Sequence, residues 1–141
     1  MERETDLSPE DIINQIAHVE REPELIPFVR SVEILESGND FARYRVCGQT
    51  YGLPWWIQYK KTWDYETGTV KWWSEKGAYG FQNVGRLTIR KADGRNIIRL
   101  DAGFSVCLPW IGCIIERTIC PALHYAFGKW LDRLASGAAH E

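Results

Sequence analysis

Residues 97–135, IIRLDAGFSVCLPWIGCIIERTICPALHYAFGKWLDRLA, contain one change of hydrophobic period, and that change decides the fold. In the first ten residues, Ile98 and Leu100 have the opposite phase to Arg99, which is typical of a strand with one buried face. After Pro109, apolar residues recur every three or four positions, as they do along one side of a helix. The predicted helical stripe consists of Ile111, Ile114, Ile115, Thr118, Ile119, Ala122, Leu123, Ala126, Phe127, Trp130, Leu131 and Leu134. A helix with so broad an apolar side must pack on another apolar layer, which the preceding strands can supply.

The alternating pattern extends upstream to about Arg30 and is interrupted by turn signals at 37–40, 67–68 and 93–94. It predicts a series of antiparallel strands, each with one buried face and one wet face. In one of these strands the predicted buried side carries Trp55, Ile57, Tyr59, Trp63 and Tyr65, and the wet side carries Gln58, Lys60, Thr62 and Asp64.

Two short helices are predicted ahead of these strands. Ser8 can cap the first helix, and Pro9 suits its first turn. Pro23 and Pro27 bracket the second helix. Only residues 3–7 are available for a strand before the first helix, so we expect a short first strand.

The composition is that of a globular protein. The chain has 141 residues and a mass of 16.3 kDa, with 45% hydrophobic and 26% charged residues, so we expect a single domain, 1–141, with a frayed tail over 136–141. The net charge of -2 and pI near 5.9 argue against the broad cationic surface that nucleic-acid binding requires. No apolar run reaches transmembrane length and the N-terminus is charged, so we expect a cytoplasmic protein.

The cysteines and histidines do not form a metal-binding pattern. Cys47, Cys107, Cys113 and Cys120 contain no CxxC pair, and the histidines stand at no metal-ligand spacing from them. We therefore expect reduced thiols, no metal and no cofactor.

The order of these elements resembles the SRPBCC or START-like superfamily, which includes polyketide cyclase/dehydrase-like and coenzyme Q-binding-like proteins. The resemblance is carried by residues 7–35, 84–89, 97–106 and 109–135. It implies an α+β helix-grip fold, in which a curved antiparallel sheet wraps around a long C-terminal helix and its first strand pairs with its last. It also implies an apolar cavity between sheet and helix, which different members use for lipids, isoprenoids, quinones or polyketides.

An aromatic cluster stands where that cavity is expected. Five of the seven tryptophans lie within residues 55–73, WWIQYKKTWDYETGTVKWW, and either plain core packing or cavity lining would account for them. The residues predicted to line the cavity and bind a ligand are Tyr44, Tyr59, Trp63, Trp72, Leu87, Phe104, Ile115 and Phe127.

Lys61 falls on the predicted buried side of its strand, which is unusual for a lysine. It either reaches solvent at a bulge or at the sheet end, or it stands in the cavity as a cation that pairs with a ligand carboxylate, Asp101 or Glu116. Lys61, Tyr59 and Asp101 are the candidates for proton transfer, although Asp101 stands with Arg99 on the wet side of its strand, where the pattern favours a surface pair.

These observations favour a non-catalytic protein that binds or carries a small hydrophobic ligand. The alternative is a cyclase or dehydratase acting on a polyketide-like substrate, which two ionisable groups meeting inside the cavity would favour. A third interpretation is an interaction module that contacts a membrane through Trp56 and Trp73. Residues 76–82, KGAYGFQ, form either a lid with Tyr79 or Phe81 at its tip or an ordinary hairpin connection.

Overall fold

The computed structural model describes residues 1–108 and 110–137. Its helices and strands follow one another in the predicted order. The strands are β1 (Glu2–Thr5), β2 (Val29–Ser37), β3 (Phe41–Thr50), β4 (Leu53–Asp64), β5 (Thr69–Gly77), β6 (Phe81–Ala92) and β7 (Arg95–Val106). The helices are α1 (Pro9–Ala17), α2 (Glu22–Leu25) and α3 (Gly112–Ser136), with short 3-10 turns η1 (Val19–Arg21) and η2 (Ala78–Gly80).

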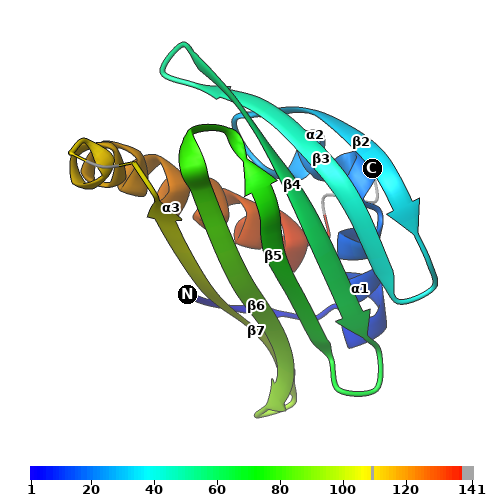
Figure 1. Ribbon diagram of the computed structural model, residues 1–141. Helices are drawn as coiled ribbons and strands as arrows, with labels where there is room; N and C mark the ends of the chain where they lie inside the picture. Colours follow the sequence, from blue (N-terminus) through cyan, green and yellow to red (C-terminus); the bar gives the residue numbers. More distant parts are fainter. Residues whose placement is uncertain (109, 138–141) are drawn as a thin grey trace.

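The strands form one antiparallel sheet in the order β1-β7-β6-β5-β4-β3-β2 (Figure 1). As predicted, β1 is short and pairs with the last strand, its residues lying opposite 96–99 of β7. Residues 101–106 of β7 therefore have no neighbouring strand on that side within the described chain. At the end of this edge, the backbone N–H of Val106 donates to the carboxylate of Glu116 on α3, at 3.0 Å.

The two short N-terminal helices form where their capping residues predict. The side chain of Ser8 accepts a hydrogen bond from the backbone N–H of Asp11 at 3.1 Å, and Pro9 is the first helical residue of α1. Pro23 stands in the first turn of α2, where its missing N–H costs nothing. Both helices turn their apolar residues inward, so they close one end of the sheet's inner face.

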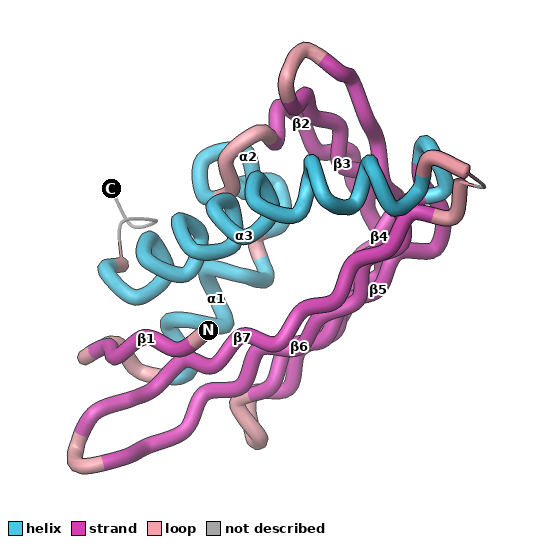
Figure 2. Tube along the Cα trace, turned by 90° about the vertical axis from the view of Figure 1, so that its left-hand side faces the viewer, coloured by secondary structure: helices cyan, strands magenta, loops and turns pink. Residues whose placement is uncertain are grey.

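Helix α3 lies along the concave side of the curved sheet, with α1 and α2 beside its C-terminal half (Figure 2). This is the α+β helix-grip architecture that the sequence predicts. The helix ends at Gly137, whose φ of 69° is left-handed. Ser136 therefore belongs to the helix and not to the predicted tail, whose residues 138–141 lie outside the described residues.

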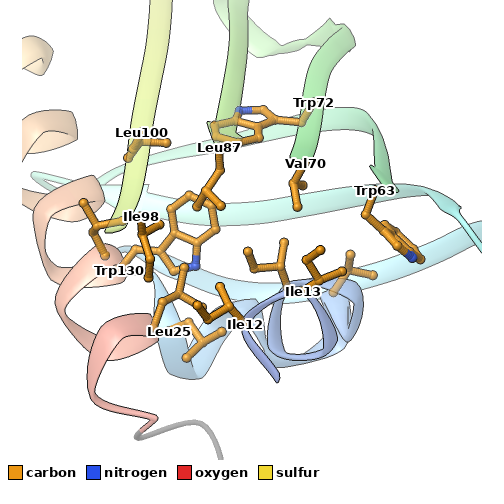
Figure 3. Close-up of a cluster of buried hydrophobic side chains, with 14 of the residues drawn as sticks. Ile12, Ile13, Leu25, Trp63, Val70, Trp72, Leu87, Ile98, Leu100 and Trp130 are labelled. Atoms are coloured by element: carbon orange, nitrogen blue, oxygen red, sulfur yellow. The ribbon is translucent and has the colours of Figure 1, made fainter. Parts of the chain in front are cut away.

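The main core fills the space between the C-terminal half of α3, the helix α1 and the sheet (Figure 3). Its buried members include Ile12, Ile13, Ile16, Val70, Leu87, Ile98, Leu100, Trp130, Leu131 and Leu134. The N-terminal end of α3 is different, because Ile114 in its first turn is 65% exposed and Ile111, just before the helix, is 51% exposed. The apolar stripe of the helix is thus buried in the core toward its C-terminus and partly exposed at its N-terminal end.

Two aromatic residues depart from the sequence prediction. Trp63 packs in the main core and its indole N–H donates to the backbone oxygen of Asn39 at 3.0 Å. Tyr65, predicted on the buried side, follows the end of β4 and is exposed, with its hydroxyl donating to Asn14 Oδ1 at 2.7 Å. The alternation fails there because the strand ends at Asp64.

Candidate ligand cavity

A cavity of about 390 Å³ lies between the sheet and α3, where it is lined by the helix from Ile114 to Trp130. Its walls are mainly apolar and come from α2, the segment 26–29, the strands β3 to β7, the turn between β3 and β4, and α3. Six of the eight predicted lining residues stand on these walls: Tyr44, Tyr59, Trp72, Phe104, Ile115 and Phe127. The prediction is wrong for Trp63 and Leu87, which are buried in the main core and do not line the cavity. Their role as ligand contacts is therefore withdrawn, and that of the other six stays a prediction.

Glycines opposite two of the tryptophans keep the cavity hollow. Trp72 pairs with Gly85 across β5 and β6, and a Cβ at Gly85 would overlap the indole ring. Gly48 stands in the same relation to Trp55 across β3 and β4. Each ring therefore lies over a bare stretch of backbone, close to the sheet, and leaves room in front of it.

Asn83 holds two of the wall's aromatic residues in place. Its Oδ1 accepts hydrogen bonds from the Tyr59 hydroxyl at 3.2 Å and from the Trp72 indole N–H at 3.0 Å. Its Nδ2 donates to the backbone oxygen of Gly103 at 2.8 Å. Sequence reasoning missed Asn83, although its position on the buried phase of β6 is a signal that alternation alone could have found.

A buried ion pair stands on the wall of this cavity. Lys61 of β4 binds Oε1 of Glu22 on α2, and the two residues are only 3% and 5% exposed. The hydroxyl of Tyr44 donates to the same oxygen at 2.8 Å. The Lys61 ammonium also lies 5.2 Å from the Tyr44 ring centroid and 6.0 Å from that of Trp130.

This geometry corrects the predicted environment of Lys61. The side chain stays buried and does not reach solvent, and its partner is Glu22, which sequence reasoning did not consider. Glu116, one of the predicted partners, instead accepts a hydrogen bond from the backbone N–H of Val106. Asp101 stands on the outer face of the sheet and pairs with Arg99 at 2.9 Å, so it is a surface residue and cannot transfer protons in the cavity.

The two tyrosines of the wall are held in their neutral form. Burial raises the pKa of the Tyr44 hydroxyl well above its ordinary value, and the charge of Glu22 and its hydrogen bond raise that pKa further. Burial, followed by the charge of Glu22, also raises the pKa of Tyr59. Both hydroxyls are therefore proton donors in hydrogen bonds at neutral pH, and neither is available as a base.

The rim of the cavity is apolar. Tyr51 and Leu53, at the turn between β3 and β4, line the mouth together with Ile114 of α3, and all three are exposed. Phe81 also lines the cavity. Tyr79, the predicted lid residue, lies in η2, and its hydroxyl donates to the backbone oxygen of Pro54 at 2.9 Å, which favours an anchored hairpin connection.

The predicted membrane-contact residues lie on the opposite face of the sheet. A cation covers each ring: Arg45 lies 5.3 Å from the Trp56 ring and Lys60 lies 5.9 Å from the Trp73 ring. Membrane contact through this spot stays a prediction. Of the helices that the structure describes, none is both long and apolar enough to span a bilayer. In the same part of the chain, no three His, Cys, Asp or Glu side chains come together as metal ligands would.

No family model and no curated protein matches this sequence. Solved structures do match. A protein from Thermus thermophilus is similar with a TM-score of 0.82 and 17% identity, over 96% of this chain and 92% of that one. The Zhui aromatase/cyclase from a Streptomyces species is similar with a TM-score of 0.78 and 14% identity, over 99% of this chain and 91% of that one. A START superfamily protein from Mycobacterium smegmatis is similar with a TM-score of 0.72 and 16% identity, over 95% of this chain and 94% of that one.

At such low identities the likeness establishes the fold and leaves the function to be argued from the site. The agreement extends over nearly the whole of each chain. The chain therefore has the helix-grip fold of the START-like superfamily that its sequence resembles.

Proposed function

We propose that this protein binds and carries a small hydrophobic molecule, such as a lipid, an isoprenoid or quinone, or a polyketide-like compound. The observation that carries the proposal is the cavity of about 390 Å³, whose mainly apolar walls are not filled by the chain's own side chains. Ligand pockets usually measure roughly 300–1,000 Å³. A guest that buries ~300 Å² of apolar surface would gain ~7 kcal/mol before the costs of association.

The test is to fill the cavity without disturbing the rest of the fold. Ile119 lines the cavity on α3, so Ile119→Trp should place an indole in the space that a ligand needs. The matched control is Val84→Trp, because Val84 is exposed on the outer face of the sheet. Native mass spectrometry and displacement of a fluorescent apolar probe should show binding to the wild type and the control, and none to Ile119→Trp. Equal binding by all three chains, or by none, contradicts the proposal.

A cyclase or dehydratase is the second candidate, because ionisable groups do meet on the cavity wall. The Glu22 carboxylate can take a proton from a carbon next to a substrate carbonyl, while the Lys61 ammonium holds the oxygen that gains negative charge. When the C–O bond of a β-hydroxyl breaks, the departing hydroxide takes the proton back from Glu22. Water leaves, and both side chains return to their starting state.

The fold likeness to the Zhui aromatase/cyclase supports this candidate. Its test is the appearance of enone absorbance when the protein is incubated with an aromatic β-hydroxy ketone. Glu22→Gln should abolish that reaction, and Asp101→Asn on the outer face should leave it unchanged. If the wild type binds the ketone and returns it unaltered, carriage is the function.

A further inference from the structure

The charges on the cavity wall cancel each other. Glu22 and Lys61 are the charged residues among those that line the described cavity, and they form one ion pair. An anionic ligand would therefore meet a cation that is already neutralised and a carboxylate that repels it. A cavity with an unpaired lysine would attract a ligand carboxylate, whereas in this cavity the lysine is already paired with Glu22.

The same pair retains unused hydrogen-bonding capacity of both kinds. Oε1 of Glu22 accepts from Lys61 and Tyr44, whereas Oε2 has no hydrogen-bond partner among the described residues. Lys61 carries three N–H donors and gives one to Glu22, while its remaining surroundings include the rings of Tyr44 and Trp130. One spare acceptor and spare donors thus stand side by side at the cavity.

The other polar side chains of the wall already make hydrogen bonds or stand at the mouth. Thr118 donates to the backbone oxygen of Ile114 at 2.9 Å, Thr50 accepts from the Trp55 indole N–H at 2.9 Å, and Tyr51 is exposed. Asn83 Oδ1 receives two donors, and its amide nitrogen donates to Gly103. The Tyr59 hydroxyl already donates its hydrogen bond to Asn83. The Lys61–Glu22 pair is therefore the buried place on the wall where a polar group of a guest meets a charged donor and a charged acceptor together.

We infer that the cavity selects ligands with an apolar body and a neutral hydroxyl group, phenol or alcohol, and discriminates against carboxylates. This inference rests on the proposed carriage function. A hydroxyl can accept from the Lys61 ammonium and donate to Oε2 of Glu22 at once, and it adds no charge. A hydrocarbon leaves both capacities unused, and a carboxylate binds only with uptake of a proton.

Three probes that differ in one group test the inference: 4-heptylphenol, heptylbenzene and 4-heptylbenzoate. Their affinities at pH 7 are measured by displacement of a fluorescent apolar probe. The phenol should bind about tenfold tighter than heptylbenzene, as expected for hydrogen bonds to charged groups, and the benzoate should bind weakest. The double variant Glu22→Gln, Lys61→Met should lose the preference for the phenol and keep its affinity for heptylbenzene.

The matched control is Arg99→Met, Asp101→Asn, which removes an ion pair from the outer face and should leave the order of affinities unchanged. If none of the probes binds the wild type, the carriage proposal itself fails. If the phenol and heptylbenzene bind equally, or the benzoate binds best, carriage stands and the hydroxyl preference is overturned. The order measured on the wild type decides this even if the double variant does not fold.

Discussion

Tryptophan and glycine act together on the inner face of this sheet. Trp72 lies over Gly85 and is held at its indole N–H by Asn83. The indole also meets Trp130 edge to face, with ring centroids 5.6 Å apart. A large aromatic residue can therefore belong to the wall of a cavity instead of filling it.

Gly85→Ala should destabilise the protein, since the added methyl group overlaps the Trp72 ring and forces the ring or the strand to move. The expected loss is roughly 1–3 kcal/mol, the usual cost of overpacking, measured by urea unfolding. The control is Gly103→Ala on β7, where the new Cβ would meet Val84 at an ordinary 3.7 Å. A loss of stability in the control as large as that in Gly85→Ala would show that the overlap with Trp72 is not the cause.

The buried tyrosines predict how stability depends on alkaline pH. Because Tyr44 and Tyr59 have raised pKa values in the folded state, they keep their protons where the unfolded chain loses them. Their contribution to the free energy of unfolding is therefore fully present below about pH 10 and decreases as the pH rises above it. Urea unfolding between pH 8 and pH 12 should show this decline, and Tyr59→Phe should make it less steep. A free energy of unfolding that is constant up to pH 12 would rule the effect out.

Helix α3 serves two purposes along its length. Its last turns pack Leu131 and Leu134 into the core, whereas the turns before them supply Ile115 and Ile119 to the cavity. Trp130 belongs to both, since it packs in the core and lines the cavity. The continuous apolar stripe in the sequence reflects both uses, since core packing and cavity lining require the same kind of residue. A stripe of this length does not by itself show where packing ends and the cavity begins.

Glu116 ties the N-terminal part of α3 to the free end of β7. Replacing it with Ala removes the acceptor of the Val106 N–H, so hydrogen exchange at Val106 should become about tenfold faster, as expected for loss of one charge-assisted bond. The exposed neighbour Arg117 provides the control, Arg117→Ala. Unchanged exchange at Val106 in Glu116→Ala would mean that another contact holds this end of the strand.

At the scale of the molecule, an internal guest should stabilise the fold because it binds the folded state and not the unfolded chain. At a ligand concentration 100 times the Kd, the gain is about 2.7 kcal/mol. For a chain of this length that corresponds to a rise in Tm of roughly 8 °C or more. Thermal unfolding with 4-heptylphenol measures it, and the filled variant Ile119→Trp should show little rise. An equal rise in Tm for the wild type and Ile119→Trp would place the binding site outside the cavity.

Local patterns determined the architecture of this protein. Ser8 and Pro9 start a helix, the alternation of Ile98 and Leu100 makes a strand, and the spacing after residue 109 makes a long helix. Each signal acts within a few residues, because hydrogen bonding and side-chain direction repeat with fixed periods along a chain. The same patterns identified six of the residues that line the cavity, since all six lie on inward-facing positions.

The tertiary structure decided what the cavity is. Lys61 meets Glu22 across 39 positions of the chain, and no local pattern connects a residue in a single-turn helix with one in a distant strand. Trp63 and Leu87 share the inward phase with Trp72, yet they pack in the core, because α1 and the C-terminal half of α3 cover that end of the sheet. The open volume exists where Gly48 and Gly85 let two indoles lie close to the sheet, and such volume is a property of packed side chains in three dimensions.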